Sequence, residues 1–434
     1  MVSTRMSFQH LVEERAHLWR VACQASTPEV WRREYWAVRK QEHKWVGAAR
    51  EKYGSAVQGV DWENRRTFVL WLNPRKVEAI PSMPLRLPGV RVDVGLADLR
   101  VEDVPGVVTL LARIKPSGLR VELQGSRELP LETILHPVRS SLRRLTLDGV
   151  RLDRRSVAYV MSLPRLASLK LYNNAVEASS VPGHRYFSRA ESLRDFHMGG
   201  SPSGDAVVQA LVRSSCARRI EGIGLWGSSM EESTSLRSLL ELPKLRRLSL
   251  SGNKKIGRQI DPSWDGWSRL LEIGLARTGL DERAAVALMS SASFGVLEDL
   301  SIGGNSIGSK GLRALLSNRT VRRLRSLLVD ETGLGDEAIV ELAESRVFRR
   351  LRYLDVADNS VTSEGVGSLI RALPGSRCER LFLNGCSLEA LRANLVDHRM
   401  ALSRLVELDV RYSGIPTRTL DAFAKRLKNT YVYV

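Results

Sequence analysis

The feature that most constrains this chain is an apolar pattern that recurs every 24 to 27 residues over its last two-thirds. Its clearest occurrence is LRYLDVADNSV, residues 351–361, with apolar side chains at Leu351, Leu354, Val356 and Val361. The alternating part predicts a short strand with one buried face. The third apolar position recurs at Leu123, Leu147, Leu171, Met198, Leu225, Leu250, Leu275, Ile302, Val329, Val356, Leu383 and Val410. Units of this length bury their apolar faces by stacking, so the spacing predicts a repeat array.

A polar position follows each predicted strand and is represented by Asn359 in the clearest repeat. Small hydrogen-bonding residues dominate its equivalents, among them Ser126, Asn174, Ser201, Ser228, Asn253, Thr278, Asn305, Thr332 and Ser413. An amide or hydroxyl here can bond free backbone groups of a buried turn. We therefore expect Asn359 to be buried, with the same residue type in the next repeat extending a ladder.

The segments between the later strands have helical periodicity. They are residues 281–289, 310–316, 335–345 and 363–373, and in the third of them Ile339, Leu342 and Ala343 are predicted to face inward. Residues 177–190 and 260–267 lack this pattern and are predicted to form loops. We expect the chain to end with a helix near 418–427 and a closing strand at 430–434.

The motif LxxLxLxxNxL with 27-residue units and helical returns resembles the ribonuclease-inhibitor-like class of leucine-rich repeat, over residues 119–434. This class includes the family of the Ran GTPase-activating protein. The resemblance implies an α/β solenoid, a horseshoe of about twelve repeats with parallel strands on the concave face and helices or loops on the convex face. It also suggests a regulator of a nucleotide-switch protein as a third possible function, although no catalytic arginine or asparagine can be matched here.

Residues 1–86 differ from the array because they hold six of the nine tryptophans. Helices are predicted at 8–24 and 27–53, and a strand at Thr67–Leu72. We interpret residues 1–86 as a helical, Trp-rich N-terminal cap and residues 87–434 as the solenoid with its closing helix and strand. The cap weakly resembles the helical companion segment of bacterial leucine-rich arrays. The alternative is a separate partner-binding domain built on the tryptophans.

Charge, cysteine spacing and the length of apolar runs limit the kinds of protein that this chain can be. The net charge of +18 comes mainly from arginine, and the four cysteines are too widely spaced for a metal or disulfide framework. No run of about 18 apolar residues occurs. We expect a soluble cytoplasmic protein, monomeric by default, with no membrane span.

The candidate catalytic motifs lack the residue spacing that catalysis requires. None of the seven histidines stands at a metal-ligand spacing from another or beside an evident nucleophile. The glycine-rich run 303–311 has Ser309 and Lys310 after Gly308, whereas a phosphate loop needs lysine directly after the second glycine. We therefore predict a protein that is not an enzyme and has no catalytic residues, no cofactor and no metal.

The strand register predicts which side chains reach the concave face. We expect a protein partner to bind there, through Tyr172, His197, Trp226, Arg247, Asp299, Asp330, Tyr353, Asp355, Phe382, Asp409 and Arg411. Aromatic residues with arginine are typical of interface hot spots. The face is also predicted to be basic in its first half and acidic in its second, which suits a folded protein. The alternative is a solvated sheet face with scattered charge.

Paired arginines precede several strands and predict a basic rim. They are Arg218, Arg219, Arg322, Arg323, Arg349 and Arg350. One hypothesis is that this rim binds nucleic acid or another polyanion. The other is that the arginines cap the carboxyl ends of the return helices, where they interact favourably with the helix dipole.

Overall fold

The computed structural model describes Ala49 and residues 56–64, 67–79, 91–173, 183–200, 203–390, 398–427 and 430–434. The chain forms two compact units; unit 1 ends at Ser228 and unit 2 runs from Ser229 to Val434. The helices predicted at 8–24 and 27–53 lie outside the described residues, apart from Ala49, which is helical and buried. The division at residue 86 therefore stays a prediction.

Unit 1 contains a sheet whose strands follow chain order. The strands are β1 (Val57–Asn64), β2 (Thr67–Leu72), β3 (Arg91–Ala97), β4 (Gly118–Glu128), β5 (Arg144–Arg151), β6 (Ser168–Tyr172), β7 (Asp195–Gly199) and β8 (Gly222–Trp226). The β1–β2 pair is antiparallel, and each later pair is parallel. The strand predicted at Thr67–Leu72 is confirmed, and it joins β3 in one sheet with the repeats.

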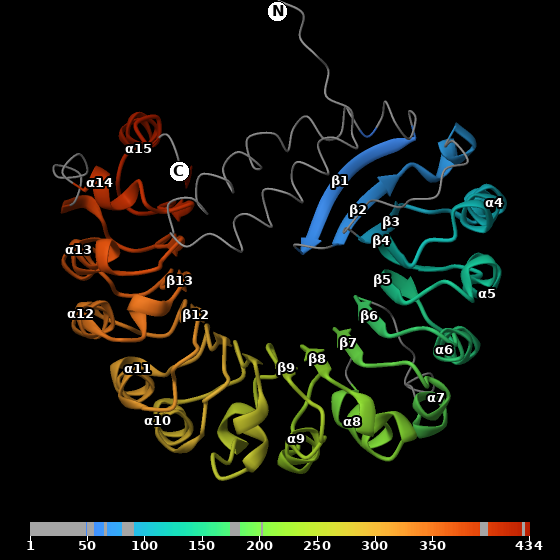
Figure 1. The fold of residues 1–434 in the computed structure, drawn as a ribbon, viewed down its shortest axis with the longest axis horizontal. Helices are drawn as coiled ribbons and strands as arrows, with labels where there is room; N and C mark the ends of the chain where they lie inside the picture. The colour runs from blue at the N-terminus through green and yellow to red at the C-terminus, as the bar shows by residue number, and fades with distance from the viewer. Residues whose placement is uncertain are drawn as a thin grey trace, which may run out of the picture. The chain divides into compact units, whose positions relative to one another are not determined.

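The connections of unit 1 are short helices and turns. They are η1 (Pro74–Ala79), η2 (Val101–Asp103), α4 (Val104–Ile114), α5 (Leu131–Leu135), η3 (His136–Val138), α6 (Arg154–Met161), α7 (His184–Arg189), α8 (Gly204–Val212) and η5 (Ser215–Arg219). Figure 1 shows α4, α5 and α6 along one side of strands β3 to β6. Each helix buries one apolar stripe; α4 buries Val107, Leu110 and Leu111, for example.

Unit 2 repeats the same plan with three-residue strands. These are β9 (Arg247–Ser249), β10 (Glu272–Gly274), β11 (Asp299–Ser301), β12 (Ser326–Leu328), β13 (Tyr353–Asp355), β14 (Arg380–Phe382), β15 (Glu407–Asp409) and β16 (Tyr431–Tyr433). Consecutive strands pair in parallel. The closing strand predicted at 430–434 is thus confirmed as β16.

The returns of unit 2 likewise lie along one side of its strands (Figure 1). They are α9 (Ser233–Leu240), η6 (Gly257–Gln259), η7 (Asp265–Arg269), α10 (Glu282–Ser291), α11 (Gly308–Ser317), α12 (Asp336–Glu344), η8 (Phe348–Arg350), α13 (Ser363–Ala372), η9 (Leu373–Gly375), α14 (Arg399–Leu402) and α15 (Thr417–Ala424). The four predicted return helices and the helix near 418–427 are confirmed. In α12, Ile339, Leu342 and Ala343 are buried as predicted.

Alternation along each strand sets which side chains enter the core. In β13, Leu354 is fully buried while Tyr353 and Asp355 are only partly buried, and Val356 just after the strand is buried again. The register pairs Leu327, Leu354 and Leu381 across neighbouring strands, so the motif leucines form one continuous apolar row. This confirms the strand register on which the surface assignments depend.

From Asn253 to Asn359, the buried polar positions of unit 2 alternate between asparagine and threonine, and Cys386 and Ser413 occupy the next two positions. Asn305 and Asn359 each reach into the preceding repeat: the Asn305 amide oxygen accepts from the backbone N–H groups of Thr278 and Leu280, both at 3.0 Å. Thr278 instead donates to the Leu275 carbonyl of its own repeat at 2.8 Å. Burial of these positions is confirmed. Neighbouring repeats can be linked without the same residue at every such position, because one asparagine bonds to backbone groups of two repeats.

Two segments that depart from the repeat, residues 177–190 and 260–267, are predicted to be loops. The first contains α7 (His184–Arg189), so that part of the prediction was wrong; Phe187 is fully buried and packs edge-to-face on Phe196 at 5.1 Å between ring centroids. The second contains no α-helix but the 3₁₀ turn η7, whose Trp267 is buried. In both segments one large aromatic side chain fills the core that a longer helix fills elsewhere.

Candidate functional site

The predicted partner-binding residues lie on the side of each sheet that faces away from its helices, here called the strand face. Tyr172, His197 and Trp226 belong to unit 1, and the other predicted residues belong to unit 2.

The strand face of unit 1 carries an exposed tryptophan. Trp226 at the end of β8 is 52% exposed, which is unusual for so large an apolar side chain. Gly199 lies between Tyr172 and Trp226 in the strand register. A Cβ at Gly199 would lie 3.1 Å from the Trp226 ring and 3.3 Å from the Tyr172 ring. The glycine therefore lets both rings lie close to the sheet, and they form an aromatic platform.

His197 adjoins this platform in the neighbouring column. Its imidazole lies over Gly224, where a Cβ would overlap the ring. Two arginines in the half of the face that is predicted to be basic are paired with carboxylates: Arg120 Nε lies 2.6 Å from Glu122 Oε1, and Arg144 pairs with buried Asp93. The aromatic platform, rather than basic charge, is thus the more distinctive feature of the unit 1 strand face.

The strand face of unit 2 carries a run of four aromatic rings. Tyr353 stacks on Phe382 with centroids 5.0 Å apart, Phe382 approaches Tyr433 at 6.4 Å, and Tyr431 meets Tyr433 edge-on at 4.7 Å. Tyr431 and Tyr433 were missed as site residues, although the register of the predicted closing strand places them in the same columns as Glu407 and Asp409.

The strand pattern predicts that Asp409 is exposed, but in the structure it is only 1% exposed. It lies between Phe382 and Tyr433 in the register. Arg411 binds both of its carboxylate oxygens, with Nη2–Oδ2 at 2.6 Å and Nε–Oδ1 at 3.0 Å. The Arg411 guanidinium also lies 5.4 Å from the Tyr433 ring centroid. Asp409 therefore holds Arg411 in place, and Arg411 remains the group available to a partner.

The other predicted charges of unit 2 lie in separate repeats. Arg247 on β9 is half-buried, and Asp299 on β11 is exposed. Asp330 lies over Gly303, where a Cβ would overlap its carboxylate, and burial raises the pKa of Asp330 above its usual value. Burial, reinforced by Asp330 and Asp409, raises the pKa of Asp355 to about 6. These carboxylates are held close to one another at a cost in stability.

Replacing Asp355 with asparagine is expected to stabilise the protein near neutral pH. Between the unfolded Asp pKa of about 3.9 and the folded value of about 6, the native state binds more protons, so stability falls as pH rises through this window. The new amide keeps an oxygen for the Ala357 N–H, from which Asp355 accepts at 3.0 Å. We expect the variant to be more stable by about 1 to 2 kcal/mol at about pH 7, with little difference at about pH 4.

Chemical denaturation of the full chain at both pH values measures this effect. Asp421→Asn, which removes an exposed carboxylate in α15, is the matched control and is expected to change stability by less than about 0.5 kcal/mol. Equal shifts in the two variants, or a gain that is the same at both pH values, would contradict the assigned proton linkage.

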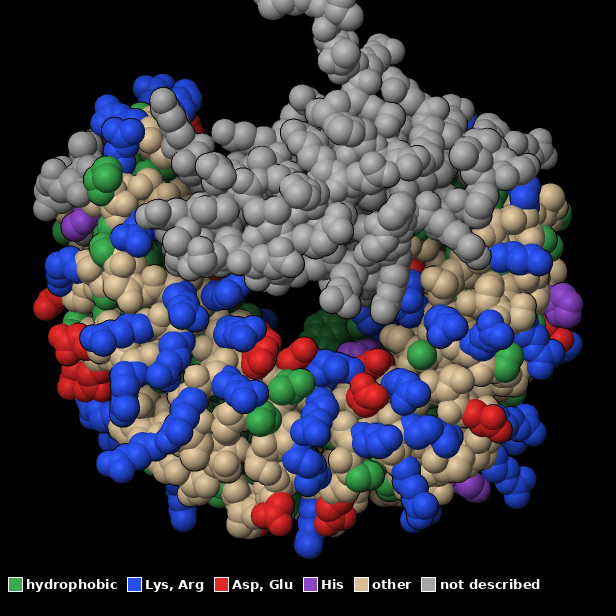
Figure 2. All heavy atoms as spheres, in the orientation of Figure 1, with side chains coloured by type: hydrophobic (Ala, Val, Ile, Leu, Met, Phe, Trp, Pro, Cys, Tyr) green, Lys and Arg blue, Asp and Glu red, His purple; other side chains and the backbone are tan. Residues whose placement is uncertain are grey.

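The predicted rim arginines separate into two sets. Arg218 and Arg219 lie in η5 of unit 1. Arg322, Arg323, Arg349 and Arg350 lie in unit 2, where they line one cleft of about 470 Å³ together with Glu298, Leu324, Arg325, Arg352 and Arg377. Figure 2 shows Lys and Arg side chains gathered over the repeats of α11, α12 and α13. Arg325, Arg352 and Arg377 were missed, although the 27-residue spacing places Arg325 and Arg352 at equivalent positions.

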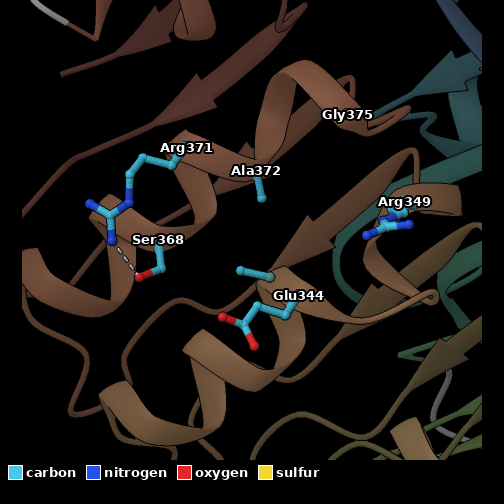
Figure 3. Close-up of a pocket in the computed structure, with 7 residues that line it drawn as sticks. Glu344, Arg349, Ser368, Arg371, Ala372 and Gly375 are labelled. Carbon is cyan, nitrogen blue, oxygen red and sulfur yellow. Dashed lines mark hydrogen bonds between the residues drawn. The ribbon is translucent and has the colours of Figure 1, made fainter.

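A second opening adjoins this cleft between α12 and α13 (Figure 3). Its volume is about 550 Å³, and it is lined by Ala343, Glu344, Arg349, Ser368, Arg371, Ala372 and Gly375. Arg371 turns toward Ser368 and donates to its hydroxyl at 2.8 Å. Arg349 lines both openings, so they share one guanidinium.

The remaining candidates for functional chemistry are metal ligands, membrane-spanning helices and cysteines. Among the residues that the structure describes, no three His, Cys, Asp and Glu side chains are grouped so as to hold a metal ion. In the same residues, no helix combines the length and the apolar character needed to cross a membrane. Cys216, Cys378 and Cys386 are free and buried, and burial raises the pKa of Cys386 to about 12, so its thiol is unreactive at neutral pH.

A sequence model and one solved structure agree with this architecture. A sequence model described as "Leucine Rich repeat" matches residues 296–316 and 349–369. The crystal structure of the Rad7 and Elc1 complex of yeast contains a chain similar to this one, with 15% identity, a TM-score of 0.51, and coverage of 73% of this chain and 80% of that chain. An internalin (inlF) of Listeria monocytogenes aligns with 13% identity and a TM-score of 0.34 over 84% of this chain and 85% of its own. No curated protein matches the sequence.

The class that the fold defines is the α/β repeat solenoid with parallel strands. The matched motif, the register and the likeness to the yeast chain show that this chain has the leucine-rich repeat fold. The finer assignment to the ribonuclease-inhibitor-like class stays a prediction.

Proposed function

We propose that this protein is a non-catalytic scaffold that binds a protein partner through its strand faces. The observation that carries the proposal is Trp226, a tryptophan 52% exposed beside Tyr172 on a rigid sheet. Rigid aromatic side chains lose little conformational entropy on binding and dominate interface energetics. The aromatic run of unit 2, with Arg411 beside it, supplies a second surface of the same composition.

Its fold relative supports a protein partner, since the similar yeast chain was crystallised as part of a Rad7 and Elc1 complex. Three free, buried cysteines are in keeping with a reducing compartment, and we place the scaffold in the cytoplasm.

Replacing both Tyr172 and Trp226 with alanine is expected to weaken partner binding by about 30-fold or more, because hot-spot truncation costs about 2 kcal/mol or more. The partner is identified by mass spectrometry after affinity purification from the native cell, and its affinity is then measured by biolayer interferometry. Trp226 is exposed, so its removal leaves the core intact.

The matched control is Val101→Ala, which truncates a side chain 61% exposed in η2 of the same unit. It is expected to bind like the unchanged protein. If the platform variant and this control retain the same affinity, the strand face of unit 1 is not the binding surface. A parallel Tyr353→Ala, Phe382→Ala variant then tests the face of unit 2.

A further inference from the structure

The arginine cleft of unit 2 is a concentration of positive charge that partner recognition by the strand face does not use. Seven arginines and one glutamate line a space of about 470 Å³. The arginines come from equivalent positions of three successive repeats, at residues 322–325, 349–352 and 377, and the glutamate is Glu298 of the repeat before them. Neighbouring repeats are about 4.8 Å apart at their strands, so the guanidinium groups converge from closely spaced positions.

Most of this charge has no internal counterion. Arg325 lies 3.6 Å from Glu298, and Arg352 lies 3.8 Å from Glu379. Arg322, Arg323, Arg349, Arg350 and Arg377 form no ion pair with any residue that the structure describes, and all five are exposed. Five unpaired like charges around one cleft repel one another, and a bound anion would relieve that repulsion.

The cluster is bounded along the array. One repeat earlier, Gly295, Val296 and Glu298 occupy the positions of Arg322, Arg323 and Arg325. In the repeat after Arg377, the equivalent Arg404 is half-buried and does not line the cleft, and Ser403 and Val406 flank it. The unpaired charge therefore forms a local pocket rather than a stripe along the repeats, which favours a compact ligand over a long polymer.

The helix-capping explanation does not account for the cluster. Arg322 donates from Nε to the Arg319 carbonyl at 3.0 Å, but α11 ends at Ser317, so this carbonyl lies beyond the helix. Arg323 lies six residues beyond the end of the same helix. Arg349 and Arg350 lie in η8, a 3₁₀ turn of three residues with only a small dipole.

We propose that the arginine cleft binds a compact ligand that carries two or more phosphate groups. Arginine presents a planar fork that holds phosphate oxygens in pairs, and guanidinium groups from successive repeats match adjacent phosphates. Because the ligand contacts three repeats at once, its binding stabilises this part of unit 2. Arg349 also lines the opening between α12 and α13, so a non-phosphate part of the ligand has room to extend there.

Isothermal titration of the full chain with sodium tripolyphosphate tests the proposal. The cleft variant replaces Arg349, Arg350 and Arg377 with alanine and is expected to weaken binding by at least about tenfold. The control replaces Arg283, Arg418 and Arg426, three exposed arginines elsewhere in unit 2, with alanine. It loses the same charge and is expected to keep the affinity within about twofold. A third variant with lysine at the three cleft positions keeps the charge and is expected to lie between the two, because it loses the paired contacts.

Two results would overturn the proposal: no binding of tripolyphosphate at low salt, or equal losses in the cleft and control variants. Far-UV circular dichroism establishes that each variant is folded, and the lysine variant keeps the test decisive if the alanine variant unfolds.

Two further arms establish the source of the phosphate. The protein is sedimented with phosphatidylcholine vesicles that contain phosphatidylinositol bisphosphate. If it sediments with them and the cleft variant does not, the ligand is a lipid headgroup. If it binds tripolyphosphate but does not sediment with the vesicles, the ligand is a free phosphate compound. Both results support the cleft. The third ligand is single-stranded RNA of several lengths. An affinity for RNA that rises with RNA length and falls equally in both alanine variants would indicate a diffuse polymer-binding surface and would overturn the proposal.

Discussion

Replacing Asn305 with alanine is expected to lower the stability of the protein by about 4 kcal/mol, because it leaves several buried backbone groups without partners. Asn305 is 4% exposed. Its oxygen accepts from the N–H groups of Thr278 and Leu280, and its Nδ2 donates to the carbonyls of Leu275 at 2.7 Å and Ile302 at 2.8 Å. Alanine removes all four bonds, and two of the repeats lose their shared link.

Chemical denaturation followed by circular dichroism measures the loss. Asn384→Ala is the control: that asparagine lies on the strand face, and its side chain makes a single long hydrogen bond within the described residues, to Asp358 at 3.4 Å, so we expect a change below about 0.5 kcal/mol. Asn305→Thr is expected to fall between them, because threonine at Thr332 bonds its own repeat through the Val329 carbonyl at 2.6 Å. If Asn305→Ala behaves like Asn384→Ala, the bridge between repeats does not carry this stability.

The same residues show which parts of the fold are predictable. The strand register follows from the period of two and the 27-residue spacing, because a shift of one residue would expose Leu354 and bury Asp355. The sequence does not predict that Asn305 bonds to the preceding repeat whereas Thr332 bonds within its own. This difference depends on which side chain is long enough to reach the preceding repeat, and the sequence motif allows either residue at each position.

The candidate sites also combine features that follow from the strand register with features that do not. Trp226 and Tyr353 were placed on the strand face from register alone, and the structure places them there. The burial of Asp409 was missed because it results from Arg411 and the flanking rings, which the pattern of a single strand does not describe. The arginine cleft was anticipated only as a row of pairs; that three repeats enclose one space depends on packing between them.

The turn-rich segment at 260–267 shows why a missing periodicity is ambiguous. It lacks a return helix, yet its core is filled, because Trp267 is 1% exposed and donates from Nε1 to the Asp261 carbonyl at 3.0 Å. Gly266 lies against the Leu240 backbone, where a Cβ would overlap the carbonyl oxygen. One tryptophan and one close glycine contact thus replace the apolar stripe of a helix, and a periodicity search does not detect such a solution.

Trp267→Ala is therefore expected to destabilise the protein by about 4 kcal/mol, through the cavity it leaves and the unpaired Asp261 carbonyl. Trp267→Phe restores most of the volume without the hydrogen bond and is expected to cost about 2 kcal/mol. Trp264→Ala, three residues away and only partly buried, is the matched control, with an expected cost below about 1.5 kcal/mol. Denaturation midpoints rank the three variants. Equal costs at Trp264 and Trp267 would mean that the segment is a surface loop after all, as its sequence first indicates, and that unit 2 does not depend on it for its core.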